Sequence, residues 1–183
     1  MTNTINHSKV SIEHTLDTFK FCPKCGAKAF EINNEVSKKC LKCSFVYYSN
    51  PRGATVAIIR NEKGEILVTK RAKNPGIGML DMPGGFIDEM ESAEQAVARE
   101  VKEETGLELK AIKYILSRPN LYLYSEVLYR TIDLFFECQV DTFNLTREES
   151  EISELMWIKP EDFDLEEFAF ESIKSGLKAY FKL

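Results

Sequence analysis

Apolar residues recur at helical spacing between residues 92 and 106, which is the most regular pattern in the chain. The apolar positions, which predict one buried helix face, are Ala93, Ala96, Val97 and Val101. Ser92 and Gln95 have the spacing of a capping box, and Gly106 suits the left-handed residue that ends many helices. The pattern therefore predicts a capped helix between Ser92 and Gly106.

Other apolar runs have the composition of β-strands. Such runs, rich in β-branched and aromatic residues, occupy residues 54–60, 66–70, part of 107–116, part of 121–140, and 156–158. Residues 61–64 have the composition of a hairpin loop, and residues 117–120 separate the runs on either side of them. Apolar residues at helical spacing predict a second helix over residues 165–182. Strands mixed with helices in this order favour an α/β fold.

Composition and charge are those of an ordinary soluble protein. A length of 183 residues suits one domain, or one domain with a small module. No apolar run approaches a membrane span and the N-terminus has no signal-peptide pattern, so we expect a cytoplasmic protein without membrane contact. The net charge of −5 argues against a general nucleic-acid binder, but not against a nucleotide whose charge a metal offsets.

Four of the five cysteines form two Cys-x-x-Cys pairs, namely Cys22, Cys25, Cys40 and Cys43. Two such turns can direct four thiolates at one point, so the pattern predicts a structural Zn²⁺ in a zinc ribbon; a redox pair and an iron–sulfur site are the alternatives. The fifth, Cys138, lies in an apolar run and is expected in the core.

We divide the chain into an arm (1–18), a ribbon (19–50) and a larger domain (51–183). Residues 1–50 hold seven lysines and four acids, which favours ordinary surface lysine over nucleic-acid contact.

Three glutamates share the polar face of the first predicted helix. Glu100, Glu103 and Glu104 stand at i, i+3 and i+4, so their carboxylates lie close together and repel one another. A hard divalent cation, Mg²⁺ or Mn²⁺, would offset that charge, whereas a solvated acidic face would need none. The Pro-Gly-Gly loop at residues 83–85 favours the metal site, because glycine lets the main chain approach a ligand closely.

The spacing of these residues resembles a known family signature. Gly85 is followed by five residues and Glu91, and then by seven residues and the run REVKEETGL from Arg99 to Leu107. This is similar to the Nudix box, G-x5-E-x7-R-E-U-x-E-E-x-G-U with U aliphatic, at every defining position. The chain thus resembles Nudix hydrolases over roughly residues 51–183, which implies an α/β/α sandwich preceded by the ribbon.

The resemblance also implies an activity and a role for each box residue. Nudix hydrolases cleave nucleoside diphosphates linked to a further group, with water attacking phosphorus and divalent cations offsetting the charge. By motif position, the implied metal ligands are Glu100, Glu103, Glu104 and the carbonyl of Gly84. Glu100 or Glu103 would also act as general base. Arg99 would orient the glutamates, with Glu91 as its partner.

Two further features resemble one branch of the family, the NADH pyrophosphatases, which pair a zinc ribbon with a Nudix domain. Glu154 stands three residues before Trp157, as in a Glu-x-x-Trp of that branch, and would be one more metal ligand; a solvated glutamate is the alternative. Residues 117–125 lie where the branch carries S-Q-P-W-P-F-P-x-S, but they lack its Gln, its Trp and two prolines. These departures imply a substrate pocket different from one for NADH.

Three residues are candidates for contact with substrate. Tyr122 and Tyr124 could stack on a base or could be core tyrosines, and Arg71 could reach phosphates or stay solvated in its loop. We expect a metal-dependent hydrolase of a nucleoside diphosphate derivative, such as ADP-ribose, NADH or a nucleotide sugar. A nucleotide-sensing regulator or an RNA-binding module is the alternative, which the full set of box glutamates disfavours. The expected partner is a small nucleotide derivative and not nucleic acid, and a homodimer is left open.

Overall fold

The structure, a computed structural model, describes residues 14–124 and 127–183. The chain forms two compact units, Met1–Asn50 and Pro51–Leu183, and each has its own hydrophobic core. Among the described residues, no helix is both long enough and apolar enough to cross a membrane.

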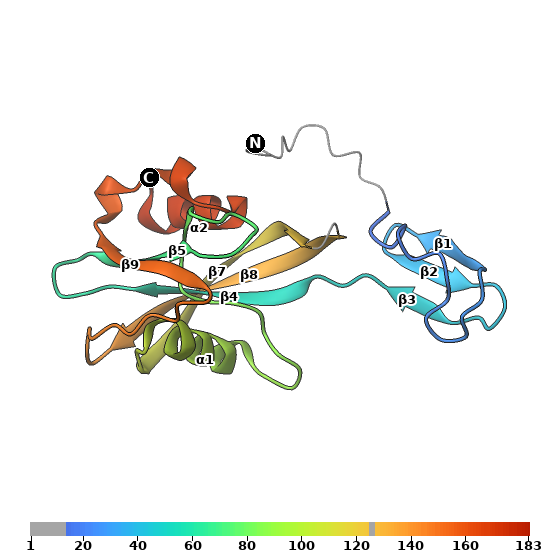
Figure 1. The fold of residues 1–183 in the computed structure, drawn as a ribbon, viewed down its shortest axis with the longest axis horizontal. Helices are drawn as coiled ribbons and strands as arrows, with labels where there is room; N and C mark the ends of the chain where they lie inside the picture. The colour runs from blue at the N-terminus through green and yellow to red at the C-terminus, as the bar shows by residue number, and fades with distance from the viewer. Residues whose placement is uncertain (1–13, 125–126) are drawn as a thin grey trace. The chain divides into compact units, whose positions relative to one another are not determined.

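The first unit is a small antiparallel sheet built around cysteines. Strands β1 (Phe30–Asn34), β2 (Ser37–Cys40) and β3 (Val46–Tyr48) pair in that order (Figure 1). Its core consists of Phe30 and the buried cysteines Cys22 and Cys40. So small a core cannot stabilise a fold by itself, so a bound metal would supply the remaining folding free energy.

Residues 14–18, the described part of the predicted arm, pack against this sheet. Leu16 is buried, and a ring nitrogen of His14 lies 2.8 Å from the carbonyl oxygen of Asn34. The main chain turns here, with the N–H of Asp17 donating to the His14 carbonyl. The rest of the predicted arm, residues 1–13, lies outside the described residues.

In the second unit, one sheet consists of β4 (Arg52–Ile59), β8 (Val127–Val140) and β7 (Leu109–Tyr124), in that order. β4 runs parallel to β8, and β7 and β8 form one long antiparallel hairpin. The strand-like runs on either side of residues 117–120 belong to one strand, because β7 continues through these residues. Pro119 is tolerated there because β7 is an edge strand, where a missing N–H need not interrupt the ladder.

The other sheet places β5 (Ile66–Arg71) between β6 (Leu80–Asp81) and β9 (Ile152–Ile158), antiparallel to both. The strand predicted at residues 156–158 therefore begins earlier than expected. After β9 the chain makes two short 3-10 turns, Pro160–Asp162 and Leu165–Glu167.

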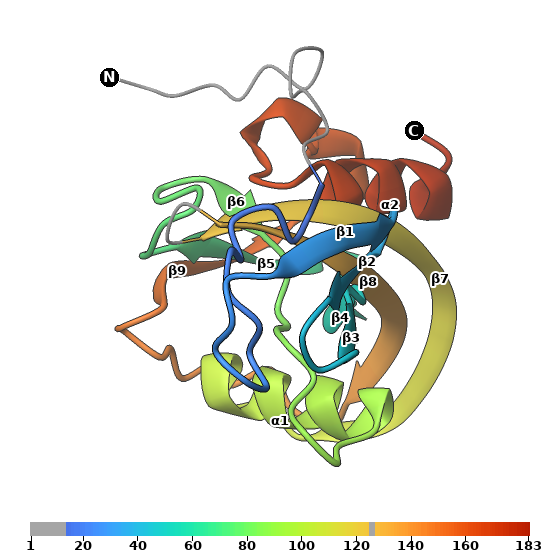
Figure 2. The ribbon, with the colours of Figure 1, turned by 90° about the vertical axis from the view of Figure 1, so that its right-hand side faces the viewer.

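Two helices enclose the sheets from opposite sides. α1 (Ala93–Thr105) lies on one side and α2 (Glu171–Phe181) on the other, as both Figure 1 and Figure 2 show. The predicted α/β/α sandwich is confirmed. In α1 the hydroxyl of Ser92 accepts the N–H of Gln95, whose side chain accepts the Ser92 N–H, and Gly106 has φ 76°. The predicted caps are therefore confirmed.

α2 is shorter than the helix predicted over residues 165–182. The side chain of Asp164 accepts the N–H of Glu166, which closes a separate 3-10 turn before the helix. Phe168 then adopts extended geometry and forms a β-bridge with Leu80. Burial of Phe168 in the core outweighs the local helical pattern.

Alternate residues of the central strands enter two separate cores. In β4, Val56 and Ile58 pack in the core beneath α2, whereas Ala57 and Ile59 pack in the core beneath α1. Successive side chains of a strand point to opposite faces of the sheet, and both faces of β4 are covered by a helix. The apolar run at residues 54–60 therefore reflects burial on both sides of the sheet.

Candidate active site and cysteine metal centre

The Pro-Gly-Gly loop between β6 and α1 runs beside β4 and pairs with its main chain. The N–H of Thr55 donates to the Gly85 carbonyl at 2.7 Å, and the N–H of Ala57 donates to the Pro83 carbonyl at 2.8 Å. Between them, no hydrogen bond from any described residue reaches the carbonyl of Gly84. Gly84 has φ 143°, and a Cβ there would collide with the Thr55 carbonyl. Only glycine fits, and its carbonyl remains available to a ligand.

The carboxylate of Glu104 lies against this loop. Glu104 lies in the last turn of α1, and its carboxylate accepts a hydrogen bond from the N–H of Gly84 at 2.9 Å. Burial raises the pKa of Glu104 well above its usual 4.5, the Gly84 N–H opposes this, and the nearby charge of Asp81 raises the pKa further. A bound cation would remove much of this electrostatic penalty.

Glu100 lies on the other side of the same loop. A Cβ on Gly85 would come within 2.5 Å of the Glu100 Cδ, so the second glycine lets the main chain touch the carboxylate. Burial raises the pKa of Glu100, and a hydrogen bond from Arg99 opposes the shift. Glu100 and Glu104 line one cavity together with Gly84 and Gly85, whereas Glu103 does not.

Arg99 connects three of the box glutamates. Its Nε and Nη2 each lie 2.9 Å from one oxygen of Glu91, and its Nη1 lies 2.8 Å from Glu100 and 3.2 Å from Glu103. Nη2 also donates to the Phe86 carbonyl at 3.0 Å. The hydrogen bonds from Arg99 lower the pKa of Glu91. Arg99 and Glu91 thus form an ion pair with two hydrogen bonds, and Arg99 also contacts Glu100 and Glu103.

Glu103 occupies a different position from the other two helix glutamates. Its side chain is 58% exposed and is held by Arg99. Within residues 14–124 and 127–183, only one group of three or more metal-binding side chains converges, and it is the cysteine group. Glu103 would therefore have to leave Arg99 to join a cation beside Glu100 and Glu104.

Among the acids outside the box, Glu151 lines the cavity beside Glu104 and the predicted Glu154 does not. Glu151 lines the site with Glu104, whereas Glu154 is absent from that lining, is half exposed and faces Lys70 at 3.9 Å. The register of β9 slips by one residue between its pairings with Lys70 and Arg71, and such irregularities re-aim side chains. Sequence reasoning missed Glu151 because the acidic run offered several glutamates and the register was unknown.

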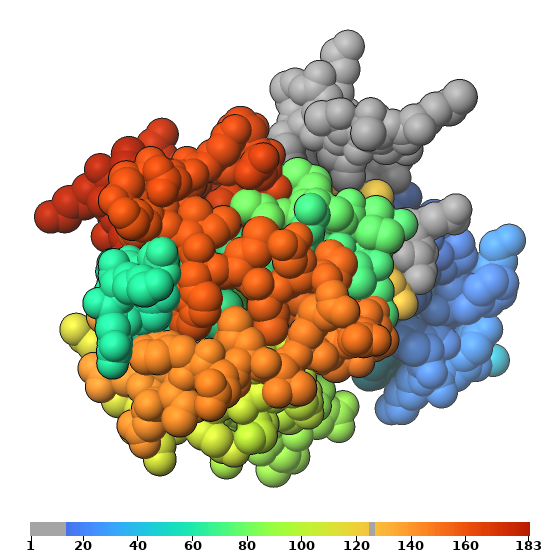
Figure 3. Space-filling view, turned by 60° about the vertical axis from the view of Figure 1, so that its left-hand side comes forward, coloured from blue at the N-terminus to red at the C-terminus, as the bar shows by residue number. Residues whose placement is uncertain are grey.

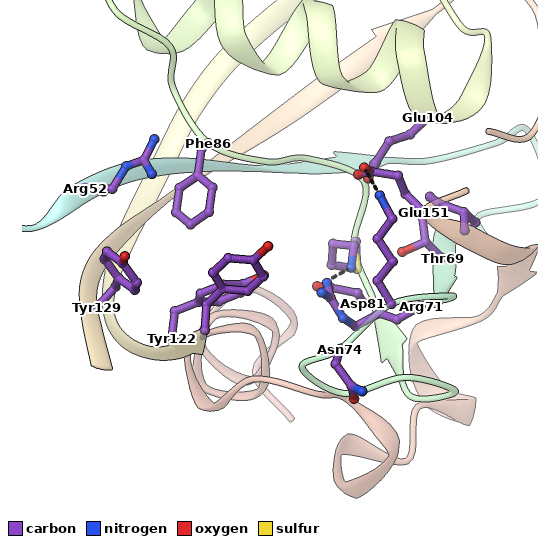
Figure 4. A pocket seen from close by; sticks show the side chains of 14 residues that line it. Arg52, Thr69, Arg71, Asn74, Asp81, Phe86, Glu104, Tyr122, Tyr129 and Glu151 are labelled. Atoms are coloured by element: carbon purple, nitrogen blue, oxygen red, sulfur yellow. Dashed lines mark hydrogen bonds and ion pairs between the residues drawn. The ribbon is translucent and has the colours of Figure 1, made fainter. Parts of the chain in front are cut away.

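Two adjoining cavities form the site, one of ≈ 350 Å³ and one of ≈ 250 Å³, and they share Phe86, Glu104 and Tyr122. Figure 4 shows that the rings of Phe86, Tyr122 and Tyr129 gather with Arg52 at one end, whereas Glu104 and Glu151 lie at the other. The Tyr122 ring is edge-on to Phe86 at 5.5 Å between centroids. One space thus combines an acidic end with an aromatic end. Phe86 and Tyr129 were not predicted from the sequence.

Arg71 lines the larger cavity but is already engaged. Its Nη1 lies 2.6 Å from Oδ2 of Asp81, its Nε donates to the Pro75 carbonyl at 2.7 Å, and its guanidinium lies over the Phe170 ring. Burial raises the pKa of Asp81, and the Arg71 charge opposes that shift. Asp81 therefore neutralises the charge of Arg71, and a phosphate would have to share the guanidinium with Asp81.

The four cysteines of the first unit converge on one point. Their sulfur atoms lie within 4.8 Å of one another, with Cys22–Cys43 and Cys25–Cys40 distances of 3.7 Å. A tetrahedral Zn²⁺ with bonds of about 2.3 Å separates its sulfurs by roughly 3.8 Å. Hydrogen bonds, chiefly from the N–H of Cys43, lower the pKa of the Cys40 thiol to about 7, whereas the pKa of Cys43 rises to about 11 because the lowering by the N–H of Phe45 is outweighed by burial and the neighbouring sulfurs. The donor set and its spacing therefore fit zinc.

Comparisons with known proteins agree with this geometry. The chain is 32% identical over 149 residues to the NAD-capped RNA hydrolase NudC of Haemophilus influenzae, which covers 81% of this chain and 54% of that protein. The chain thus spans about half the length of the curated relatives it matches. A NUDIX hydrolase structure from Nitrosomonas europaea is 24% identical, with a TM-score of 0.67, and covers 89% of this chain and 90% of that one.

A third protein has the same fold around a bound nucleotide derivative. The NUDIX domain of Shewanella oneidensis NrtR, crystallised with ADP ribose, is 20% identical with a TM-score of 0.60 and covers 74% of this chain and 90% of that one. The sequence profile of the NUDIX domain matches residues 50–178 of this chain. The box, the sandwich fold and this match establish that the chain belongs to the NUDIX family.

Proposed function

We propose that the second unit hydrolyses the diphosphate linkage of a nucleoside diphosphate derivative with the help of Mg²⁺ or Mn²⁺. The single observation that carries the proposal is the combination of an acidic end and an aromatic end in one cavity. A diphosphate needs cations, and the base beside it needs a flat apolar surface. Both requirements are met within the length of one pocket.

The donor set supports a divalent cation at the acidic end. Glu100, Glu104 and Glu151 surround the loop whose Gly84 carbonyl lacks a hydrogen-bond partner among the described residues. Carboxylate and carbonyl oxygens are the ligands that Mg²⁺ and Mn²⁺ prefer. When bound, such a cation supplies charge neutralisation of the diphosphate and a lower pKa of its water.

The remaining residues have roles that follow from their contacts. Arg99 fixes Glu100 through the hydrogen bond at 2.8 Å, while Glu91 holds Arg99 by two further bonds. A carboxylate in the acidic end accepts the proton of the attacking water, whose oxygen bonds to phosphorus as the bond to the bridging oxygen breaks. Glu100 is our choice for this base over Glu103, because Glu100 lines the cavity and Glu103 does not.

The aromatic end would hold the base or nicotinamide ring. Tyr122, Tyr124 and Tyr129 line it with Phe86, and the guanidinium of Arg52 lies 4.5 Å from the centre of the Phe86 ring. Stacking on such rings is worth about 1–3 kcal/mol per base. A planar heterocycle is therefore the expected occupant, with the diphosphate directed toward Glu104.

An NAD-type dinucleotide is the substrate that we propose first, either free or as the cap of an RNA. The NudC relatives are named for NAD-capped RNA, and the NrtR domain shows that this fold accommodates ADP ribose. The pattern of residues 117–125 nevertheless differs from the NADH pyrophosphatase pattern, so ADP-ribose and nucleotide sugars belong in the same test.

A product-release assay across these compounds tests the proposal. We expect hydrolysis of at least one dinucleotide or nucleotide sugar that requires added Mg²⁺ or Mn²⁺ and is abolished by chelator. A full panel of nucleoside diphosphate derivatives that binds with no turnover would instead favour a sensing domain. Nucleoside triphosphates serve as the comparison, since their cleavage alone would place the reaction in a different substrate class.

A further inference from the structure

Charge is distributed unevenly between the two units of this chain. Residues 1–50 contain seven lysines and four acids, whereas residues 51–183 contain 17 basic and 25 acidic residues. The net charge of −5 is therefore the sum of a basic first unit and an acidic second unit. Phosphate backbones bind basic surfaces with strong salt dependence, so the ribbon is the part of the chain suited to a polyanion.

The ribbon also exposes apolar side chains on one face of its sheet. Lys38 in β2 is paired with Ile32 in β1 and with Tyr47 in β3. Ile32 is 58% exposed and Tyr47 is 46% exposed. Phe19, 50% exposed, belongs to the segment that crosses this face. We name Phe19, Ile32 and Tyr47 the ribbon face. Exposed aromatic rings of this kind are stacking platforms for unpaired bases.

A buried lysine holds the ribbon face together. Lys38 is only 3% exposed, its Nζ donates to the Phe19 carbonyl at 2.7 Å, and it lies 5.3 Å from the centre of the Phe30 ring. The ammonium therefore fixes the main chain of Phe19 over the sheet. The aromatic ring is presented by a structured segment, so less ordering entropy would be lost on binding.

Exposed lysines surround the two cysteine turns. Lys24 and Lys42 occupy the same position in the two Cys-x-x-Cys turns, and the side chains of both are exposed. Lys28 and Lys39 are exposed as well. Lysine at these positions adds nothing to a core, but it provides mobile positive charge that can follow a phosphate backbone.

We propose that the ribbon binds single-stranded RNA, with Phe19 and Tyr47 stacking on bases and the lysines contacting phosphates. The inference deepens the proposed function, because the strand would be the RNA that extends from an NAD-type cap. Exposed aromatic rings on a unit that also carries exposed lysines favour unpaired nucleotides over an acidic protein, which would use the charge alone. The expectation from net charge that nucleic acid is no partner would then hold for the catalytic unit only.

Binding is tested with the full zinc-loaded chain and a fluorescent 12-nucleotide RNA without a cap. We expect fluorescence anisotropy to show binding that weakens steeply with salt. A Lys24→Gln, Lys42→Gln variant should lower the slope of log K against log salt by about 1.4, since each phosphate contact on single strands contributes about 0.7. A Phe19→Ala, Tyr47→Ala variant should weaken binding roughly tenfold or more. Lys63→Gln, Lys113→Gln, two exposed lysines of the acidic unit, is the matched control and should bind as wild type.

Catalysis separates this inference from the proposed function. The ribbon variants should lower kcat/KM for NAD-capped RNA about tenfold while leaving that for free NAD-type dinucleotide within about twofold of wild type. Equal loss on both substrates, or wild-type RNA binding by both ribbon variants, would overturn the inference. Binding of polyglutamate that depends on the lysines and not on the rings would overturn it as well. RNA binding without turnover of any substrate would refute the proposed function and leave the ribbon surface standing. Zinc content and melting temperature check that each variant is folded. If the aromatic variant is not folded, RNA binding by the lysine variant tests the inference.

Discussion

Lys73 Nζ lies 2.6 Å from Oε1 of Glu151, so an ion pair joins the loop after β5 to the residue before β9. The main chains are also joined, because the N–H of Ala72 donates to the Glu151 carbonyl at 2.8 Å. In Figure 3 the green loop after β5 lies directly against the orange segment that precedes β9. Both charged side chains are about half exposed, so the ion pair adds little stability by itself. Its consequence is positional, since it holds the Glu151 carboxylate beside the cavity.

The first prediction distinguishes Glu151 from Glu154. Glu151→Gln removes a charge that faces Glu104, and we expect kcat to fall at least roughly a hundredfold. Glu154→Gln, three residues later and within β9, is the matched control and should stay within about threefold of wild type. Turnover with saturating Mg²⁺ measures both variants. A larger loss in Glu154→Gln would restore the assignment made from the Glu-x-x-Trp spacing.

The second prediction concerns the helix glutamates. Glu104→Gln keeps the side-chain shape and removes a charge from the cavity, so it should lower turnover at least roughly a hundredfold, whereas Glu103→Gln should cost less than Glu104→Gln. Glu94→Gln, an exposed change in the first turn of α1, should leave it unchanged. Because Glu103 is bound by Arg99 and lies outside the cavity lining, a loss in Glu103→Gln as large as that in Glu104→Gln would show that Glu103 leaves Arg99 to join the cation.

The third prediction is a pH dependence of stability in chelated protein. Burial raises the pKa of Glu104 and of Glu100, so the folded state binds these protons more tightly than the unfolded state. The stability is then fully present below the unfolded pKa and is lost as the pH rises through the raised folded pKa. We expect the melting temperature of wild type to fall as the pH rises above the usual carboxyl pKa of 4.5, and to fall less in Glu104→Gln.

Two comparisons check that this slope comes from the acidic site. Glu94→Gln changes the net charge equally and should keep the wild-type slope. Added Mg²⁺ should flatten the wild-type curve, because a cation stabilises the ionised carboxylates. Identical slopes in Glu104→Gln and Glu94→Gln would show that overall charge repulsion, and not this site, controls the dependence.

The fourth prediction concerns the aromatic end of the cavity. Tyr124 is 55% exposed and stacks on Tyr122, so Tyr124→Ala should raise KM roughly tenfold with little loss of stability. Tyr122 also packs on Phe170 at 5.6 Å between centroids, so its alanine variant should raise KM and lower the melting temperature. Tyr114→Ala, an exposed tyrosine of β7 outside both cavities, is the control. Normal KM in both variants would make these tyrosines purely structural.

The fifth prediction concerns the cysteine centre. Protein purified without chelator should contain about one zinc per chain, and Cys22→Ser, Cys40→Ser should lose it. Because the first unit has so small a core, that variant should also lose the ordered ribbon. Cys138→Ser is the control, since Cys138 is buried in the core under α1 and should keep the zinc. Full zinc content in the double variant would contradict the assignment.

The sequence by itself determined the elements whose information is local. The caps of α1 depend on residues within a few positions of each other, and so does the box that follows Gly85. The four cysteines carry their chemistry in their side chains, so their spacing sufficed to place them at one centre. These features were predicted because no distant contact is needed to define them.

Only the tertiary structure decided which distant residues share the site. Glu151 and not Glu154 lines the cavity with Glu104, and this placement depends on the pairing of the Glu151 main chain with Ala72 in the loop after β5. Phe86 and Tyr129 reach one cavity from segments more than 40 residues apart, which no periodicity reveals. Pro119 lies within a strand because β7 is at a sheet edge, and α2 begins late because Phe168 is buried. In each case long-range packing outweighs local preference, since burial and pairing contribute more free energy than a turn or helix propensity.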